Sequence, residues 1–327
     1  MKEIGGYIEL DSYTGSMLHE NSVKLNCGRN ALAYILKAKK IEKIWMPKFM
    51  CDSCDLVLSN CGVETQYYSI GLDFKPQVKQ RGEDWLYVVN FYGQLSNEYL
   101  VSLGKNVIVD NAQAYFQLPI PGRDTLYTCR KFFGVTDGAI LYTDQQIEIL
   151  EQDESFERMH FILGRYERCA GEFYQEYVDN NHFFQKEPIK RMSKLTENLL
   201  HGIDYDAIRR KRTENFAYLH ERLESTNQLR LVVPDGAFMY PYYVENGFKL
   251  RKKLQAEKIF IPTLWPAVFN ICTEDELEYD MAQNILPLPV DQRYNVDDME
   301  YIVDMIDSRG GKTSLVTETK PLCMPQQ

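Results

Sequence analysis

Between residues 28 and 145 the chain alternates between helix-like and strand-like segments, and this alternation limits its possible folds most. The segment GRNALAYILKAKK places Ala31, Leu32, Ile35 and Leu36 on one helical face. The runs KIWMP, VETQYYSI, WLYVVNFYG, KNVIVD and TLYT are apolar and partly β-branched, as buried parallel strands are. Such alternation is typical of βαβ units. We therefore predict an α/β fold with a mostly parallel central sheet and helices on both faces.

The second half of the chain has a different character. Helical stretches rich in Glu, Arg and Tyr continue from residue 150 to about 225. A smaller α+β region follows, with the apolar runs LRLVVP, MYPYYV and IFIPTLWP, a helix at GFKLRKKLQAEK and a last helix near 296–307. We predict a large domain over 1–205, a small C-terminal α+β domain over 206–308, and a disordered tail over 309–327. A site is expected between the two domains.

Bulk properties exclude several classes of protein. The net charge of −10 argues against a general binder of nucleic acid or of anionic membranes. The basic run at 209–212 lies in a helical pattern, and we expect it to form a solvated helix face. No apolar run approaches the roughly 18 to 20 residues that span a bilayer. Because the N-terminus also lacks a signal-peptide pattern, we expect a cytoplasmic protein.

The eight cysteines are scattered and lie inside apparent elements, as free buried thiols do. The pair Cys51-x-x-Cys54, with Cys61 nearby, comes nearest to a zinc motif. No second CxxC pair and no histidine stand at ligand spacing, so we expect no metal site.

Three positions stand where predicted strands end or helices begin, and ligands collect at such ends in open α/β sheets. Asp110 ends VIV, Lys131 follows TLYT, and Gly28 precedes a helix. Each has an ordinary alternative, in which Asp110 caps a helix, Gly28 forms a turn, and Lys131 keeps its charged end in water. Together they supply what pyridoxal phosphate (PLP) needs: an amine for the imine, a carboxylate for the pyridinium nitrogen, and a helix N-terminus for the phosphate. We therefore hypothesise that Lys131 is a Schiff-base lysine.

At these residues the chain resembles the DegT/DnrJ/EryC1/StrS family, the sugar aminotransferases of PLP fold type I, over roughly residues 20–307. NCGRNAL is similar to the family's phosphate loop, VVNFYGQ to its Val-His-x-Tyr-Gly-Gln, and VIVDNAQAYF to its Glu-Asp-Ala-Ala-Gln-Ala, the most specific match. TCRKFFGVTDGAILYTD resembles the family's lysine segment, RMSKLTENLLHGID its Arg-Met-(Ser/Thr)-Asp-Leu helix, and ILPLPVDQRYNVDDMEYIVDMI its closing segment and last helix. The matches follow the same order in both.

The resemblance implies roles for single residues. Lys131 would form the Schiff base and move a proton between substrate carbon and cofactor. Asp110 would pair with the pyridine nitrogen, and Gln113 would reach the phenolic oxygen of the ring. The phosphate would be held by backbone amides at a helix start, a glycine that permits close approach, and a threonine in place of the family's serine: Arg29 and Asn30, Gly28, and Thr128.

Two family positions are different in this chain. The aromatic residue that stacks on the ring falls at Cys51, so Phe49 or Tyr92 would have to stack instead. The asparagine that reaches the partner subunit's cofactor is replaced by Pro188 or Ile189.

The resemblance implies an aminotransferase that moves an amino group from an amino acid, expected to be glutamate, to a keto sugar, expected to be nucleotide-linked. Two subunits build each site in this fold type, so a homodimer is also implied. For proton transfer we expect Lys131 to be buried beside Arg130. Three alternatives stay open: another PLP-dependent sugar enzyme such as a dehydratase, a relative that binds PLP or a sugar nucleotide without turnover, and an α/β protein without the cofactor.

Overall fold

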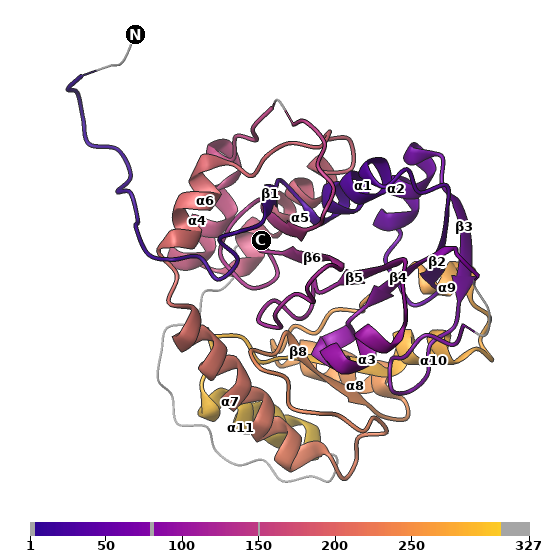
Figure 1. Cartoon of the computed structure of the whole chain (residues 1–327). Helices are drawn as coiled ribbons and strands as arrows, with labels where there is room; N and C mark the ends of the chain where they lie inside the picture. The colour runs from indigo at the N-terminus through magenta and orange to yellow at the C-terminus, as the bar shows by residue number, and fades with distance from the viewer. Residues whose placement is uncertain (1–3, 79–81, 150, 309–327) are drawn as a thin grey trace.

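The computed structural model describes residues 4–78, 82–149 and 151–308 (Figure 1). The tail predicted to be disordered, 309–327, lies outside the described residues. The elements of the first part are β1 (Val23–Leu25), α1 (Gly28–Ala38), β2 (Lys43–Pro47), α2 (Ser53–Cys61), β3 (Glu64–Tyr68), β4 (Trp85–Val89), the 3₁₀ turn η1 (Phe91–Gly93), α3 (Asn97–Ser102), β5 (Val107–Asp110), β6 (Asp124–Thr128) and β7 (Ala139–Tyr142). Those of the second part are η2 (Phe156–Arg158), α4 (His160–Glu167), η3 (Ala170–Phe173), α5 (Tyr174–Phe183), α6 (Lys194–His201), α7 (Tyr205–Leu223), β8 (Met239–Tyr243), α8 (Gly247–Ala256), α9 (Val268–Ile271), α10 (Leu277–Asn284), β9 (Ile285–Pro289) and α11 (Val296–Asp307).

A seven-stranded sheet forms the centre of the molecule, in the order β1-β7-β6-β5-β4-β2-β3. The strands β3, β2, β4, β5 and β6 run parallel, whereas β7 runs antiparallel to both of its neighbours, β6 and the edge strand β1. In Figure 1, α1 and α2 lie above the sheet as drawn, and α3 lies below it with α8 and β8. The predicted α/β architecture with a mostly parallel sheet is confirmed.

The register of the sheet brings the strand ends together. Val89 at the end of β4 pairs with Asp110 at the end of β5, and Asp110 pairs with Leu126 in β6. Helix α1 packs on β6 and β7 with the apolar face that its sequence pattern predicts, since that face is buried. The carboxyl ends of β4, β5 and β6 therefore share one edge, where ligands collect in such sheets.

The C-terminal region is built on the antiparallel pair β8–β9, with α7 and α11 side by side against it (Figure 1). It has its own hydrophobic cluster, which begins at Phe216 and ends at Ile306. However, α9 and α10 contribute Val268 and Met281 to the cluster of the large sheet. The predicted domain boundary at residue 205 stays a prediction. Among the helices of the described residues, none combines the length and apolar character that crossing a bilayer requires.

Two apolar runs of the C-terminal region form no strand. In LRLVVP, the side chain of Gln94 donates to the carbonyl of Val232 (3.0 Å) and accepts from its amide (2.8 Å). In IFIPTLWP, two prolines lack the amide that a strand ladder needs, and Gln255 donates to the carbonyl of Ile261 (2.9 Å). Side chains therefore replace strand partners for these backbone groups.

The expectation of a solvated basic face on α7 is wrong at Arg212. This side chain is only 2% exposed, whereas Arg210 is exposed and Arg209 pairs with Asp206 and Asp235 on the surface. The physical reason is helical period, because position 212 lies one turn before Phe216, on the buried face of the helix.

Candidate functional site

The ends of β5 and β6 bring Asp110 and Lys131 together. Asp110 is the last residue of β5, and Lys131 lies in the turn after β6, where the amides of Phe132 and Phe133 both bond to the carbonyl of Cys129 (3.0 and 2.9 Å). The two are close enough for the charge of Lys131 to lower the pKa of Asp110.

Lys131 is exposed in the single chain, so the expectation that it is buried is wrong there. Its Nζ lies 5.6 Å from the ring centre of Phe238, a contact that covers one side of the ammonium group. The neighbouring Arg130 turns away from it, because its guanidinium donates to Oδ1 of Asn181 (2.9 Å) and lies over the ring of Phe184. The amine of Lys131 is thus open to small molecules.

Asp110 is a buried carboxylate, 8% exposed. Its Oδ2 accepts from the hydroxyl of Tyr87 (2.8 Å) and its Oδ1 from the amide of Ala112 (2.8 Å). Burial raises the pKa of Asp110, and the charge of Lys131 and the two hydrogen bonds oppose this shift. No helix follows directly in the described chain, so Asp110 forms an Asx-type turn instead of a helix cap. Burial outweighs these three groups, so a further positive charge beside the carboxylate would stabilise its ionised form.

Gln113 is held in place by the loop after β4. Its Oε1 accepts from the amide of Tyr92 (2.8 Å), a residue in the left-handed region with φ 54°. Because the carbonyl of Gln113 is engaged there, its NH₂ group is the part that can donate to a ligand oxygen.

The N-terminus of α1 lies against the end of β6. A Cβ on Gly28 would come within 3.3 Å of Cγ2 of Thr128, so glycine is what permits this close approach. The first turn contains no acidic residue, and Cys27 makes no cap hydrogen bond there. Burial raises the pKa of Cys27, against the effect of the Asn30 and Arg29 amides, so its thiol is neutral and adds no negative charge. The turn is therefore suited to an anion.

The side chains of this turn face another segment of the same chain. Nδ2 of Asn30 donates to the carbonyl of Pro188 (2.7 Å), and Asn26 donates to the same carbonyl (3.2 Å). Arg29 donates to the carbonyl of Asn181 (3.0 Å). The predicted roles of Arg29 and Asn30 in phosphate binding therefore depend on their backbone amides. The carbonyl of Pro188 is hydrogen-bonded to α1 and to the residues before it in the same chain.

Neither of the two aromatic residues expected to stack on the cofactor ring is open to a ligand. Phe49 is 1% exposed and Tyr92 is 0% exposed. Phe49 packs on Trp265 (4.6 Å between ring centres) and Phe91 (5.4 Å), and Tyr92 packs on Phe74 and Trp265. That expectation is wrong, because both rings are used in a core cluster.

Cys51, set aside in the sequence as an incomplete zinc motif, lies at the site itself. Its Sγ is 2.9 Å from Oγ of Ser53. A hydrogen bond from Cys54 is the largest cause that lowers the pKa of Cys51 to about 6; Ser53 and the charge of Lys131 act in the same direction, against burial and Asp110. The only signal in the sequence for a place at the site was that Cys51 stands where the family has the aromatic residue that stacks on the cofactor ring.

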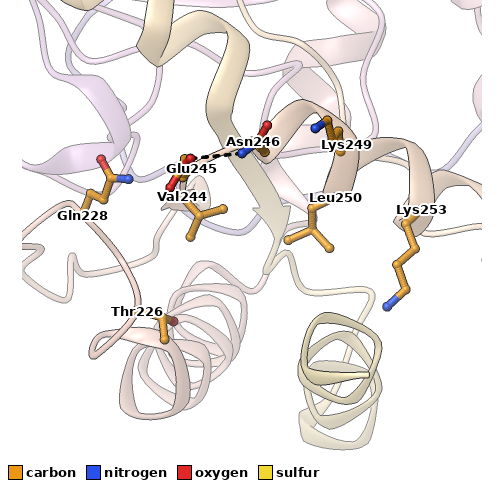
Figure 2. Close-up of a pocket in the computed structure, with 8 residues that line it drawn as sticks. All are labelled: Thr226, Gln228, Val244, Glu245, Asn246, Lys249, Leu250 and Lys253. Carbon is orange, nitrogen blue, oxygen red and sulfur yellow. Dashed lines mark hydrogen bonds between the residues drawn. The ribbon is translucent and has the colours of Figure 1, made fainter. Parts of the chain in front are cut away.

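A separate hollow of ≈ 620 Å³ lies in the C-terminal region (Figure 2). Its only hydrogen bond between the residues drawn runs from Asn246 to Glu245 (3.3 Å), and Lys253 is engaged by the carbonyl of Met305. No predicted site residue lines it, and it holds no buried titratable pair, so it is not the candidate active site. Its lining consists of Thr226, Gln228, Val244, Glu245, Asn246, Lys249, Leu250 and Lys253.

No family model and no curated protein sequence matches this chain. Solved structures do match it. DesV of S. venezuelae in complex with a ketimine intermediate has a TM-score of 0.62 at 16% identity, over 90% of this chain and 85% of that one. A DegT DnrJ EryC1 StrS aminotransferase from Brucella abortus has a TM-score of 0.58 at 16% identity, over 89% and 86%. The putative sugar aminotransferase Spr1654 from Streptococcus pneumoniae, in its PMP form, has a TM-score of 0.61 at 13% identity, over 88% and 87%. The predicted fold, that of the type I aminotransferases, is confirmed.

Proposed function

We propose that this chain is a PLP-dependent aminotransferase of the DegT/DnrJ/EryC1/StrS type that aminates a keto sugar. The observation that carries the proposal is that the buried Asp110 ends β5 and Lys131 follows the adjacent β6, within reach of each other's charge. The N-terminus of α1 beside Thr128 supplies the third element, an anion-binding turn. The fold shared with sugar aminotransferases supports the same chemistry.

The donor groups of the site fit PLP. Asp110 is a buried carboxylate whose pKa is raised by burial despite the charge of Lys131, and a protonated ring nitrogen would stabilise its ionised form further. Gly28 leaves room at the start of α1, where the amides and the Thr128 hydroxyl would hold a phosphate. The NH₂ of Gln113 would donate to the phenolic oxygen. When bound, PLP supplies an electron sink for the carbon that loses its proton.

The residues of the chain then have distinct tasks. The exposed amine of Lys131 would bind the carbonyl carbon of the cofactor until a substrate amine displaces it, and its Nζ would then take and return a proton. Asp110 would hold the proton on the ring nitrogen, with Tyr87 fixing the direction of its carboxylate. Glutamate as donor, and a nucleotide-linked keto sugar as acceptor, belong to the proposal through the resemblance.

The first experiment is an absorption spectrum of the purified protein with PLP. The expected result is a visible band that borohydride removes. The reduced pyridoxyl group should then be found on the peptide that contains Lys131. Lys131→Ala should lose the band, whereas the control Lys48→Ala should keep it, because Lys48 forms an ion pair with Glu276. A wild-type protein that takes up no PLP would contradict the proposal.

Glutamate alone separates the proposed transfer from the other PLP-dependent alternatives. We expect it to convert bound PLP to pyridoxamine phosphate with release of 2-oxoglutarate, one per site. A sugar dehydratase or a binder without turnover would leave the spectrum unchanged with glutamate. The substrate is then found by adding keto sugars, with and without a nucleotide, to the pyridoxamine form and following the return of the PLP band.

A homodimer is part of the proposal, and an exposed aromatic surface supports it. Large apolar side chains of α4 and α5, two helices that pack on each other, are exposed in the single chain, and a second copy would cover them. Asn181 of α5 bonds to both Arg29 and Arg130, so this surface adjoins the site. Sedimentation should show a dimer that Tyr166→Glu with Tyr174→Glu separates, whereas Tyr301→Glu on α11 should not. The surface comprises Leu163, Tyr166, Tyr174, Tyr177 and Phe183.

A further inference from the structure

Arg212 of α7 is a buried cation whose hydrogen bonds all end near the lysine turn. Its Nη2 donates to the carbonyl of Phe132 (3.3 Å), and its Nη1 donates to the carbonyls of Ala237 (2.9 Å) and Phe238 (3.4 Å). Its Nε donates to Oε1 of Gln292 (2.8 Å). The guanidinium also lies 4.6 Å from the ring centre of Phe132.

The charge of Arg212 has no ion-pair partner within the described chain. The carboxylate of Asp291 acts on it only through its charge and is bonded to Arg293 instead (2.6 and 2.8 Å). Burial lowers the pKa of Arg212 to about 10. Burying an unpaired cation is unfavourable. The hydrogen bonds of Arg212 must therefore offset this cost, and the groups that accept them indicate what the arginine does at this position.

Two of these partners flank Lys131. Phe132 is the next residue in the chain, and its carbonyl accepts a second hydrogen bond from Nε2 of Gln292 (2.8 Å). Phe238 carries the ring that faces Nζ of Lys131 at 5.6 Å. Arg212 thus holds the carbonyl of the residue after Lys131 and the backbone of Phe238, whose ring the Lys131 ammonium contacts.

We propose that Arg212, together with Gln292, is a positioning residue that holds Lys131 at the end of β6 beside Asp110. This inference rests on the proposed function, in which Lys131 is the reacting amine. Arg212 lies in α7, and Gln292 follows β9. The C-terminal region therefore sets the position of a lysine that belongs to the large sheet.

The first test uses the protein without cofactor. The protein is acetylated with trace acetic anhydride over a pH series and then mapped by peptide analysis. This measures the acetylation rate of Lys131 relative to that of Lys48 at each pH, which gives a pH profile for each lysine. We expect Arg212→Leu and Gln292→Leu to change the pH profile of Lys131 and not that of Lys48. Arg212→Lys, which retains the positive charge but offers its donors from a single nitrogen, should restore part of the wild-type profile. In the loaded protein, loss of these hydrogen bonds should weaken PLP binding about tenfold.

Arg251→Leu is the matched control for a purely structural effect. Arg251 is also buried in the C-terminal region and donates to the carbonyl of Ile285 (2.7 Å), but it does not contact the lysine turn. The inference is overturned if Arg251→Leu changes the pH dependence of Lys131 acetylation as much as Arg212→Leu does. It is also overturned if Gln292→Leu leaves both this pH dependence and PLP binding unchanged. If Arg212→Leu fails to fold, Gln292→Leu and Arg212→Lys decide the question. The two proposals can also fail separately. If the wild type binds no PLP, but Gln292→Leu still changes the pH dependence of Lys131 acetylation, the proposed function is refuted and the positioning of Lys131 by Arg212 and Gln292 is retained.

Discussion

The hydroxyl of Tyr87 donates to Oδ2 of Asp110 over 2.8 Å, from the middle of β4 to the end of the neighbouring β5. Both residues are buried, so the hydroxyl is one of the few groups that support this carboxylate. Tyr87→Phe should lower the free energy of unfolding at pH 7 by about 1 kcal/mol, because Oδ2 loses its donor. Denaturant unfolding measures the change. Tyr67→Phe, which loses a hydrogen bond to Asp55 on the surface, should have almost no effect, and an equal loss in both variants would contradict this account.

Asp110→Asn should stabilise the cofactor-free chain at neutral pH. Burial raises the pKa of Asp110 in the folded state, so folding favours the protonated form. The wild type therefore loses stability as pH rises from the ordinary value of about 4 through the raised one. Asparagine has no charge to bury, so its melting temperature should exceed that of the wild type at pH 7. The difference should shrink below about pH 4, where the wild-type carboxyl is also neutral.

The same variant should bind PLP more weakly, on the order of tenfold or more, because it cannot pair with a protonated ring nitrogen. Stability and affinity thus move in opposite directions in Asp110→Asn. Fluorescence titration with PLP, beside thermal unfolding of the cofactor-free chain, measures both. A variant that is less stable at every pH would show that the Asp110 charge is better supported than the structure indicates.

The thiol of Cys51 should react with iodoacetamide at unusually low pH. Its pKa is lowered to about 6, first by the hydrogen bond from Cys54, so its labelling rate should rise through that pH and then level off. Cys54→Ala should move the midpoint upward. Cys61, whose pKa is raised by burial, is the internal reference and should react only at higher pH. Mass spectrometry of the peptide that holds both residues compares them, and coincident profiles would refute the assignment. Saturating PLP should protect Cys51.

Gly28→Ala should weaken PLP binding, and a second substitution should reverse much of the loss. The added Cβ would lie 3.3 Å from Cγ2 of Thr128, closer than such contacts normally are, so the Thr128 side chain or the start of α1 must shift by a few tenths of an ångström. Thr128→Ser removes that methyl group and keeps the hydroxyl. We expect Gly28→Ala to raise the PLP dissociation constant several-fold, about 1 kcal/mol, and the double variant to recover most of it. A double variant no better than Gly28→Ala would place the cause elsewhere than in this contact.

Local pattern in the sequence was sufficient for most of the secondary structure. The apolar face of Gly28–Ala38, the strand at Val107–Asp110 and the last helix at Val296–Asp307 were each predicted from residues adjacent in the chain. The placement of Asp110 and Lys131 at one edge also followed, because parallel strands put their carboxyl ends on the same side of a sheet.

What the sequence alone determined is therefore what depends on neighbours along the chain: the period of each element, and the polar residue at its end. Tertiary structure decided what depends on residues far apart in the chain. The partners of Arg212 include Gln292, 80 positions away, and those of Gln94 include Val232, 138 positions away. Whether a cation is buried or an apolar run becomes a strand depends on which distant group satisfies its hydrogen bonds, and residue periodicity carries no information on that choice.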